Sequence, residues 1–183
     1  MRRLLLSSSL ALLACLAGVG SSPAGAPDCQ SRAIERLHAA PDGFALYQKV
    51  SDRKFFLAFL SCDEAQLGLP TAVHESVHYL TAEADAFPLL GGGELKRPHQ
   101  VSAFFAPSLI ADRFKTNDFV DTYLRPGRAS SSRDFLYLLD ELNAYTHDLN
   151  TAVALSRSQA SAEGEYEVDH RDGLAALMAF VAL

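Results

Sequence analysis

The stretch TAVHESVHYL at residues 71–80 decides how the fold is organised, because it sets two histidines four residues apart. At 3.6 residues per turn, His74 and His78 lie one above the other on a single helix face, so their imidazoles can converge on one point. Glu75 lies about 100° further around the helix, at the edge of that face. Two neutral imidazoles can hold a metal ion, and a carboxylate beside them can accept a proton from the water bound to that ion. The pattern therefore predicts a metal-binding helix. The alternative is that the histidines only hydrogen-bond beside a core helix while Glu75 is solvated.

The helix that carries this pattern is expected to span residues 69–84. Pro70 is tolerated in a first turn, and Val73, Val77 and Leu80 form an apolar stripe beside the histidines. One part of the helix surface should therefore enter the core, while the neighbouring part carries the site.

A second long helix is predicted at residues 130–155, where apolar residues recur at helical spacing. Ser131 and Asp134 resemble a capping box with Asp in place of Glu. Glu141 stands one turn before Tyr145 and flanks the apolar stripe, so its carboxylate can point towards a site in the body of the protein.

The HESVH pattern resembles the motif of the zincin metallopeptidases, which bind a catalytic zinc through three protein ligands and leave one position open. The metzincin branch would continue with glycine and histidine where this chain has Thr81 and Ala84. The deuterolysin-like branch would require Gly-Thr and Tyr-Gly signatures, which this chain lacks. What remains resembles the gluzincin branch, in which a glutamate from a later helix is the third ligand. The stretch DELNAY at residues 140–145 resembles that element, with the small Ala144 where the two helices could approach closely.

This resemblance implies a site for Zn²⁺ held by His74, His78 and Glu141. It implies that Glu75 acts as general base on the zinc-activated water, and that Tyr145 hydrogen-bonds the ligand carboxylate or the transition-state oxyanion.

Other roles for these residues stay open. Asp140, Asp148 and His147 are substitutes for the third ligand, in that order. Glu141 is otherwise a solvated helix carboxylate, and Tyr145 is otherwise a core residue with its hydroxyl satisfied.

The segments before the motif are predicted from periodicity and turn residues. Residues 29–40 should form a helix that ends at the Pro-Asp-Gly turn at 41–43. The stretches FALYQKV at 44–50 and KFFLAFLSC at 54–62 are rich in aromatic and large apolar residues. This composition favours two adjacent strands or a hairpin, and the second strand could offer an edge to an extended peptide.

The segments after the motif are a loop and a terminal helix. Three glycines and Pro98 predict a loop at 89–100, in which His99 is either an ordinary exposed histidine or a substrate contact. The apolar stretch at 173–183 is too short to span a bilayer and is expected to pack on the core as a helix.

Together these elements predict an α+β fold that is mostly helical. We expect a small zincin-like domain, in which a short strand hairpin packs on the HExxH helix and a second long helix carries the third ligand. With 183 residues, 49% of them hydrophobic, the chain should form one domain over 27–183. The net charge of −6 and the lack of a basic run exclude nucleic acid as an expected partner. We expect a monomer.

The N-terminus has the layout of a secretory signal peptide over residues 1–26: two arginines, an apolar run, then small residues. Cleavage is expected near Ala26, although Pro27 is an awkward residue to follow it. The stretch LLAC at 12–15 resembles a bacterial lipoprotein box, in which Cys15 would carry a lipid that attaches the protein to a membrane. We expect an exported protein that is periplasmic, envelope-anchored or extracellular.

The two remaining cysteines, Cys29 and Cys62, are an even number in a chain that is expected to reach an oxidising compartment. We predict a disulfide between them. Two buried free thiols, or Cys62 as a metal ligand, are the alternatives.

The expected function is that of a zinc metallopeptidase that hydrolyses peptide bonds in a peptide or protein substrate. The alternatives are a noncatalytic zinc-stabilised envelope protein that binds a partner, and a zinc amidase that acts on cell-wall peptides.

Overall fold

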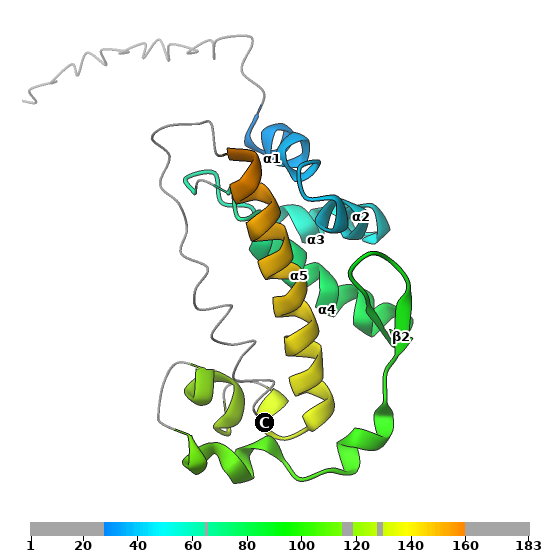
Figure 1. Ribbon diagram of the computed structural model, residues 1–183, viewed down its shortest axis with the longest axis vertical. Coiled ribbons are helices and arrows are strands. Elements are labelled where there is room, and N and C mark those ends of the chain that lie inside the picture. Colours follow the sequence, from blue (N-terminus) through cyan, green and yellow to red (C-terminus); the bar gives the residue numbers. More distant parts are fainter. Residues whose placement is uncertain (1–27, 65, 115–118, 128–129, 160–183) are drawn as a thin grey trace, which may run out of the picture.

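The computed structural model describes residues 28–64, 66–114, 119–127 and 130–159, and it is mostly helical with one two-stranded antiparallel sheet. This is the mostly helical α+β class that the sequence predicts. The long helix α5 (Phe135–Gln159) forms a spine, and α4 (Leu69–Ala84) packs across it (Figure 1). None of the helices in the described ranges combines the length and the hydropathy that a membrane span requires. The predicted leader and the apolar stretch at 173–183 lie outside the described residues.

Helix α1 (Cys29–Leu37) begins where predicted, and the side chain of Asp28 caps it by accepting a hydrogen bond from the Ser31 amide at 2.8 Å. Its first residue, Cys29, is joined to Cys62 by a disulfide, with the two Cα atoms 5.8 Å apart. The predicted disulfide is confirmed. It spans 33 positions, so loop-closure entropy should stabilise the fold by about 3–4 kcal/mol.

The prediction of strands at 44–50 and 54–62 is wrong. These residues lie largely in two short helices, α2 (Pro41–Lys49) and α3 (Arg53–Leu57). The predicted edge for an extended peptide at 54–62 therefore does not exist.

The strand prediction failed because aromatic content outweighed weaker helix signals. Pro41 is the first residue of α2 rather than part of a turn, and buried Gly43, Leu46 and Val50 follow helical spacing. The side chain of Asp52 accepts a hydrogen bond from the Lys54 amide at 3.0 Å and caps α3.

The strand hairpin instead follows the motif helix. Its first strand precedes the stretch predicted as a loop at 89–100, and its second strand lies inside that stretch. Strands β1 (Ala86–Pro88) and β2 (Glu94–Lys96) pair antiparallel, with Phe87 opposite Leu95, and β1 packs on α4. The three glycines form the turn between them. The amide of one of these, Gly91, donates a hydrogen bond of 2.9 Å to Asp42, which ties the turn to α2.

Short helical turns fill the chain between β2 and α5 and surround the N-terminal end of α5 (Figure 1). They are the 3₁₀ turns η1 (His99–Ala103), η2 (Pro107–Arg113) and η4 (Ser130–Ser132), and the π-helical turn η3 (Val120–Leu124).

The second long helix begins later than predicted. Asp134 caps it by accepting a hydrogen bond from the Leu136 amide at 2.9 Å. Ser131 does not cap the helix, because its hydroxyl donates to the carbonyl of Tyr123 at 3.0 Å.

Two hydrophobic clusters hold these parts together. The larger joins α1–α4 to α5, with Val73 and Val77 of α4 in one cluster with Ala144 and Leu155 of α5. The smaller packs η2 and η3 against the first half of α5, and its fully buried members include Leu124.

The start of α4 is fixed by Gly68, which has φ of +69° and caps the helix. A Cβ atom at this position would lie 2.5 Å from the carbonyl oxygen of Phe59 and 2.7 Å from the amide nitrogen of Ser61. Only glycine fits this close backbone approach, so the preceding loop sets where the motif helix begins.

We predict that Gly68→Ala lowers the free energy of unfolding by on the order of 3 kcal/mol, because it adds backbone overlap to a left-handed conformation. The matched control is Gly91→Ala. Gly91 has φ of +75° but nothing within 4 Å of the added Cβ, so it should cost only about 1 kcal/mol. Urea unfolding of both variants measures the difference, and equal losses would show that the close approach at Gly68 is unimportant.

Candidate metal centre

Three side chains from α4 and α5 converge on one point. The Nε2 atoms of His74 and His78 are 3.2 Å apart, and Oε2 of Glu141 lies 3.7 Å from the first and 3.6 Å from the second. The three side chains are 12–25% exposed, so the cluster is half-buried but open to solvent. The group could hold a metal ion, since each residue offers one ligand atom within 4.8 Å of the others.

Two further carboxylates lie on the far side of the imidazoles. Nδ1 of His78 donates to Oδ2 of Asp140 at 2.9 Å, and Nδ1 of His74 lies 3.8 Å from Oδ2 of Asp148. A carboxylate that accepts a hydrogen bond from Nδ1 leaves the lone pair of Nε2 free to bind a metal ion, and it fixes the orientation of the ring. Asp140 and Asp148, considered above as substitute ligands, therefore contact the histidines from behind.

The sequence of α5 explains this arrangement. Asp140, Ala144 and Asp148 recur every four residues on one helix face, and Glu141 and Tyr145 lie on the adjoining face. Ala144 is fully buried, and its small side chain lets α4 approach closely enough for the histidines to reach all three carboxylates.

The other two histidines considered for the site lie elsewhere. His147 is 2% exposed, and its Nε2 donates to the Pro88 carbonyl at 3.0 Å; burial lowers the pKa of this imidazole. His99 is exposed and pairs with Asp85 at 2.8 Å, next to the hairpin.

The charges of the cluster favour an ionised site. Burial alone would lower the pKa of His78, but the carboxylates of Asp140 and Glu141 outweigh it and raise that pKa to about 10. Burial likewise would raise the pKa of Glu141, but the imidazoles of His74 and His78 lower it to about 2. Without a metal, His78 therefore carries a proton at neutral pH where a cation would otherwise lie.

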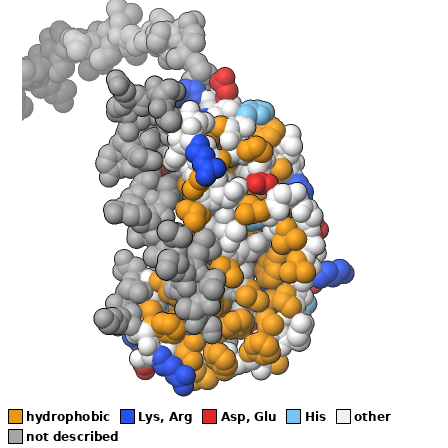
Figure 2. All heavy atoms as spheres, viewed as in Figure 1, with side chains coloured by type: hydrophobic (Ala, Val, Ile, Leu, Met, Phe, Trp, Pro, Cys, Tyr) orange, Lys and Arg blue, Asp and Glu red, His pale blue; other side chains and the backbone are white. Residues whose placement is uncertain are grey.

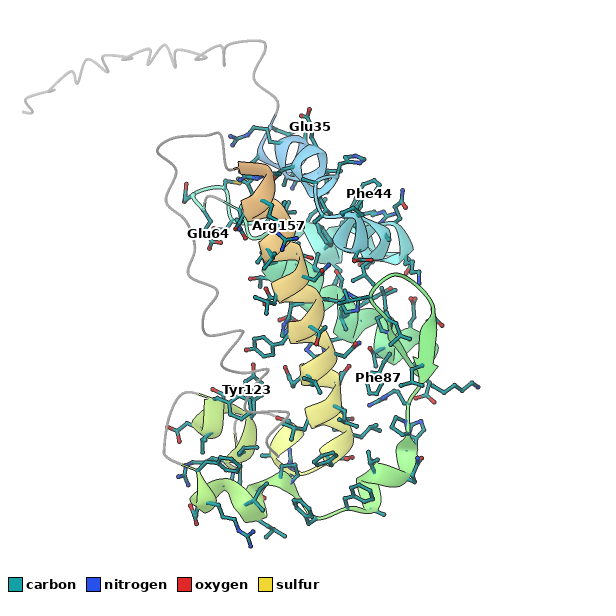
Figure 3. The ribbon with its side chains drawn as sticks, viewed as in Figure 1. Glu35, Phe44, Glu64, Phe87, Tyr123 and Arg157 are labelled. Carbon is teal, nitrogen blue, oxygen red and sulfur yellow. A yellow bond between two sulfur atoms is a disulfide. The ribbon has the colours of Figure 1, made fainter. Side chains whose placement is uncertain are left out.

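Two tyrosines flank the cluster. The ring of Tyr145 meets the ring of His74 edge-on, with centroids 4.7 Å apart, and its hydroxyl lies 2.6 Å from that of Tyr123. Figure 3 shows Tyr123 on the segment beside the N-terminal half of α5. Burial raises the pKa of Tyr123, and the hydrogen bond to Tyr145 and the charges of Glu141 and Glu75 raise it further.

The charge of Glu75 therefore acts on Tyr123, and the Glu75 side chain is half-buried on α4. Sequence reasoning did not find Tyr123, because it lies 22 positions before Tyr145 in no recognisable motif and reaches the site only through tertiary packing. In the structure, Tyr123 is marked by its place on a π-helical turn, since such turns are frequent at functional sites.

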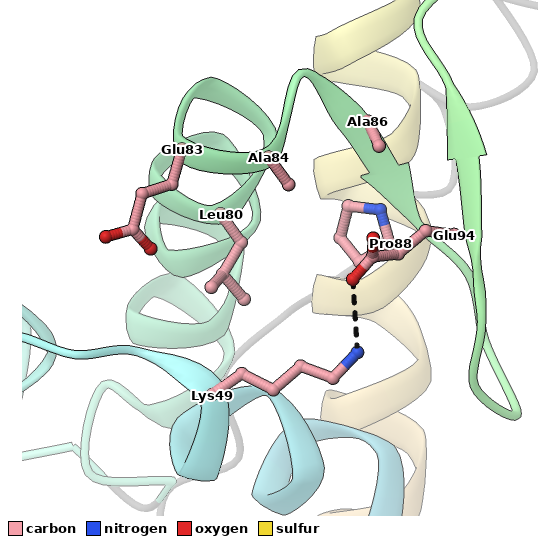
Figure 4. Close-up of a pocket in the computed structure, with 7 residues that line it drawn as sticks. All are labelled: Lys49, Leu80, Glu83, Ala84, Ala86, Pro88 and Glu94. Atoms are coloured by element: carbon pink, nitrogen blue, oxygen red, sulfur yellow. Dashed lines mark ion pairs between the residues drawn. The ribbon is translucent and has the colours of Figure 1, made fainter.

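A separate cavity of about 410 Å³ lies where α2, the end of α4 and the hairpin meet (Figure 4). Leu80, Ala84 and Pro88 contribute apolar wall, and Lys49 and Glu94 pair across it at 3.7 Å. None of the clustered donors lines this cavity, so its volume carries no evidence about the metal centre.

Comparison of the chain with protein-family models, curated proteins and solved structures finds no match. The chemistry of this protein must therefore be inferred from the cluster of donors and its surroundings.

We predict that one Zn²⁺ or Co²⁺ ion displaces about one proton when it binds near neutral pH, because a ligating imidazole must be neutral. The raised pKa of His78 sets the sign: metal affinity should fall about tenfold for each pH unit below about 10, until other ligands protonate. Calorimetric titration in buffers of different ionisation enthalpy counts the protons.

The control for this titration is Asp140→Asn, which removes the carboxylate that stabilises the protonated imidazole. Fewer protons should be released from this variant at the same pH. Unchanged proton release from the variant would show that Asp140 does not set the protonation of His78.

Proposed function

We propose that this protein is a zinc metallopeptidase with His74, His78 and Glu141 as zinc ligands. The observation that carries the proposal is the spacing of the three donor atoms, 3.2–3.7 Å. Tetrahedral zinc with bonds of 2.0–2.1 Å requires donors about 3.4 Å apart. Three protein donors would leave one position for water or substrate, as catalytic zinc sites do.

The residues around the cluster also suit zinc. Asp140 and Asp148 stand behind the two imidazoles, in the outer-shell positions that orient histidine ligands and raise their basicity. The two histidines and the later glutamate match the order and types of ligand in the gluzincin branch of the zincins, which supports that resemblance.

Bound zinc supplies the acidity that makes a water nucleophilic near neutral pH and polarises a substrate carbonyl. Glu75 accepts the proton of the attacking water and delivers it to the leaving amine. One phenol of the Tyr123–Tyr145 pair donates its proton to the other, and the accepting phenol keeps its own proton for a hydrogen bond to the substrate oxygen, where negative charge develops.

Export is part of the proposal, because a Cys29–Cys62 disulfide persists in an oxidising compartment. The signal-peptide layout of residues 1–26 supports the same destination. The substrate would accordingly be a peptide or protein outside the cytoplasm.

We predict that Glu75→Gln and Glu141→Ala fail in different ways. Glu75→Gln should keep about one zinc per chain but reduce turnover of a fluorogenic peptide library by a factor on the order of 10² to 10⁴, the usual worth of a general base. Glu141→Ala should lose zinc during dialysis, because two imidazoles alone make an incomplete site. Elemental analysis and peptide turnover separate the two defects.

The matched control is Glu83→Gln, the same change on the same helix at a side chain that bonds Ser51 and Tyr79. It should keep both zinc and turnover. Full activity in Glu75→Gln would contradict the proposed base. Tightly bound zinc with no hydrolysis of any peptide in the unaltered protein would support the noncatalytic alternative.

We also predict that Tyr123→Phe and Tyr145→Phe each reduce kcat by a factor on the order of 10² without loss of zinc, because each breaks the hydroxyl pair that faces the developing charge. Since the two phenols act together, the double variant should lose less than the product of the single losses. Tyr79→Phe, whose hydroxyl lies 2.6 Å from Ser51, is the control with unchanged kcat. Multiplicative losses in the double variant would show that the two phenols act independently.

A further inference from the structure

Large apolar side chains lie exposed around the N-terminal end of α5. The exposed fractions are 57% for Phe104, 48% for Phe105 and 73% for Leu109, with Leu95 at 56% and Tyr137 at 45%. We call these five residues the apolar patch. Figure 2 shows hydrophobic side chains gathered on the lower part of one face, over the short turns and the start of α5. Monomeric proteins rarely expose a contiguous apolar surface of this kind, so it marks a contact site.

The patch is built on a fixed framework. The rings of Phe104 and Phe105 both pack on Phe135 of α5, with centroids 5.9 and 6.3 Å apart. The guanidinium of Arg97 lies 5.7 Å above the ring of Tyr137, which links the hairpin to the same end of α5. The exposed side chains therefore project from a packed surface.

The charge of this region is opposite to that of the chain. The chain carries −6, but residues 95–114 contain three basic residues and one carboxylate, a net charge of +2. The three basic residues are Lys96, Arg97 and Arg113. The one carboxylate, Asp112, lies 3.3 Å from the guanidinium of Arg125, and Arg97 in turn lies 3.7 Å from Asp85. The positive charge that this segment offers to a bilayer is therefore that of Lys96 and Arg113. Exposed phenylalanine and leucine beside basic residues form the kind of surface that enters an anionic bilayer.

We propose that the apolar patch docks this protein onto a phospholipid bilayer with anionic headgroups, with Phe104, Phe105 and Leu109 entering the boundary between headgroups and acyl chains. This contact lies in the plane of the interface, and it does not depend on the metal chemistry. Tyr137 stands one turn before Glu141, about 6 Å along the helix axis. Docking would therefore hold the candidate metal centre close to the lipid surface.

The absence of tryptophan from the chain allows a direct test. Phe104→Trp places one fluorescent reporter in the patch, and Glu35→Trp places one at the opposite end of the molecule (Figure 3). In the full chain with vesicles of phosphatidylcholine and about 30% phosphatidylglycerol, emission from Phe104→Trp should shift to shorter wavelength. Emission from Glu35→Trp should not. Vesicles of phosphatidylcholine alone, or about 0.5 M salt, should weaken the response at least fivefold.

Two further variants test which side chains are responsible. Phe104→Ser with Phe105→Ser, and separately Lys96→Glu with Arg113→Glu, should each reduce vesicle binding at least tenfold. Unchanged thermal unfolding and zinc binding would show that the variants remain folded.

Three results would overturn the proposal. The first is no shift from Phe104→Trp on anionic vesicles. The second is a shift from Glu35→Trp alone, which would assign lipid binding to the apolar N-terminal stretch. The third is a protein that ignores vesicles but sediments as a dimer that the Phe104→Ser, Phe105→Ser variant dissociates, which would make the patch an interface between copies.

Discussion

The close approach of α4 and α5 at Ala144 is the constraint on which the site depends. A larger side chain at this fully buried position would push the helices apart and separate the histidines from Glu141. Val73 and Val77 hold α4 on the same cluster, so the packing of the core and the geometry of the donors are one feature. Gly68 adds the last condition, because it fixes where α4 begins against the preceding loop.

This packing brings carboxylates and imidazoles together, which explains how the site responds to protons. Three carboxylates of α5 face two imidazoles, and the pKa of His78 rises to about 10 while that of Glu141 falls to about 2. In the metal-free protein, the contribution of His78 to stability is complete below about pH 6.5 and is lost as pH rises towards 10. The contribution of Glu141 is present above about pH 4.5 and is lost as pH falls towards 2. A bound cation would replace the proton on His78 as the partner of these carboxylates.

The parts of this protein that local sequence signals determine could be predicted, and those that tertiary contacts determine could not. Pro70 and the apolar stripe beside His74 and His78 were enough to predict a helix at 69–84. The position of Glu141 on α5 followed from helical periodicity. In a stretch as short as 44–50 the helical spacing of Leu46 and Val50 is a weak signal, so aromatic content led to strands where the chain forms helices. No local pattern could distinguish the candidate ligand Glu141 from its neighbour Asp140, because the difference lies in which nitrogen of His78 each reaches.

The chain between β2 and α5 connects the site to the proposed lipid surface. Its inner side packs η3 on α5 and sets Tyr123 against Tyr145, whereas its outer side exposes Phe104, Phe105 and Leu109. Both sides rest on the same end of α5, where Phe135 lies fewer than two turns before Glu141. A surface that holds apolar side chains in lipid would therefore also hold the phenol pair in register with the donors. Lipid binding on the outer side and the candidate site on the inner side would therefore share one end of α5 as their support.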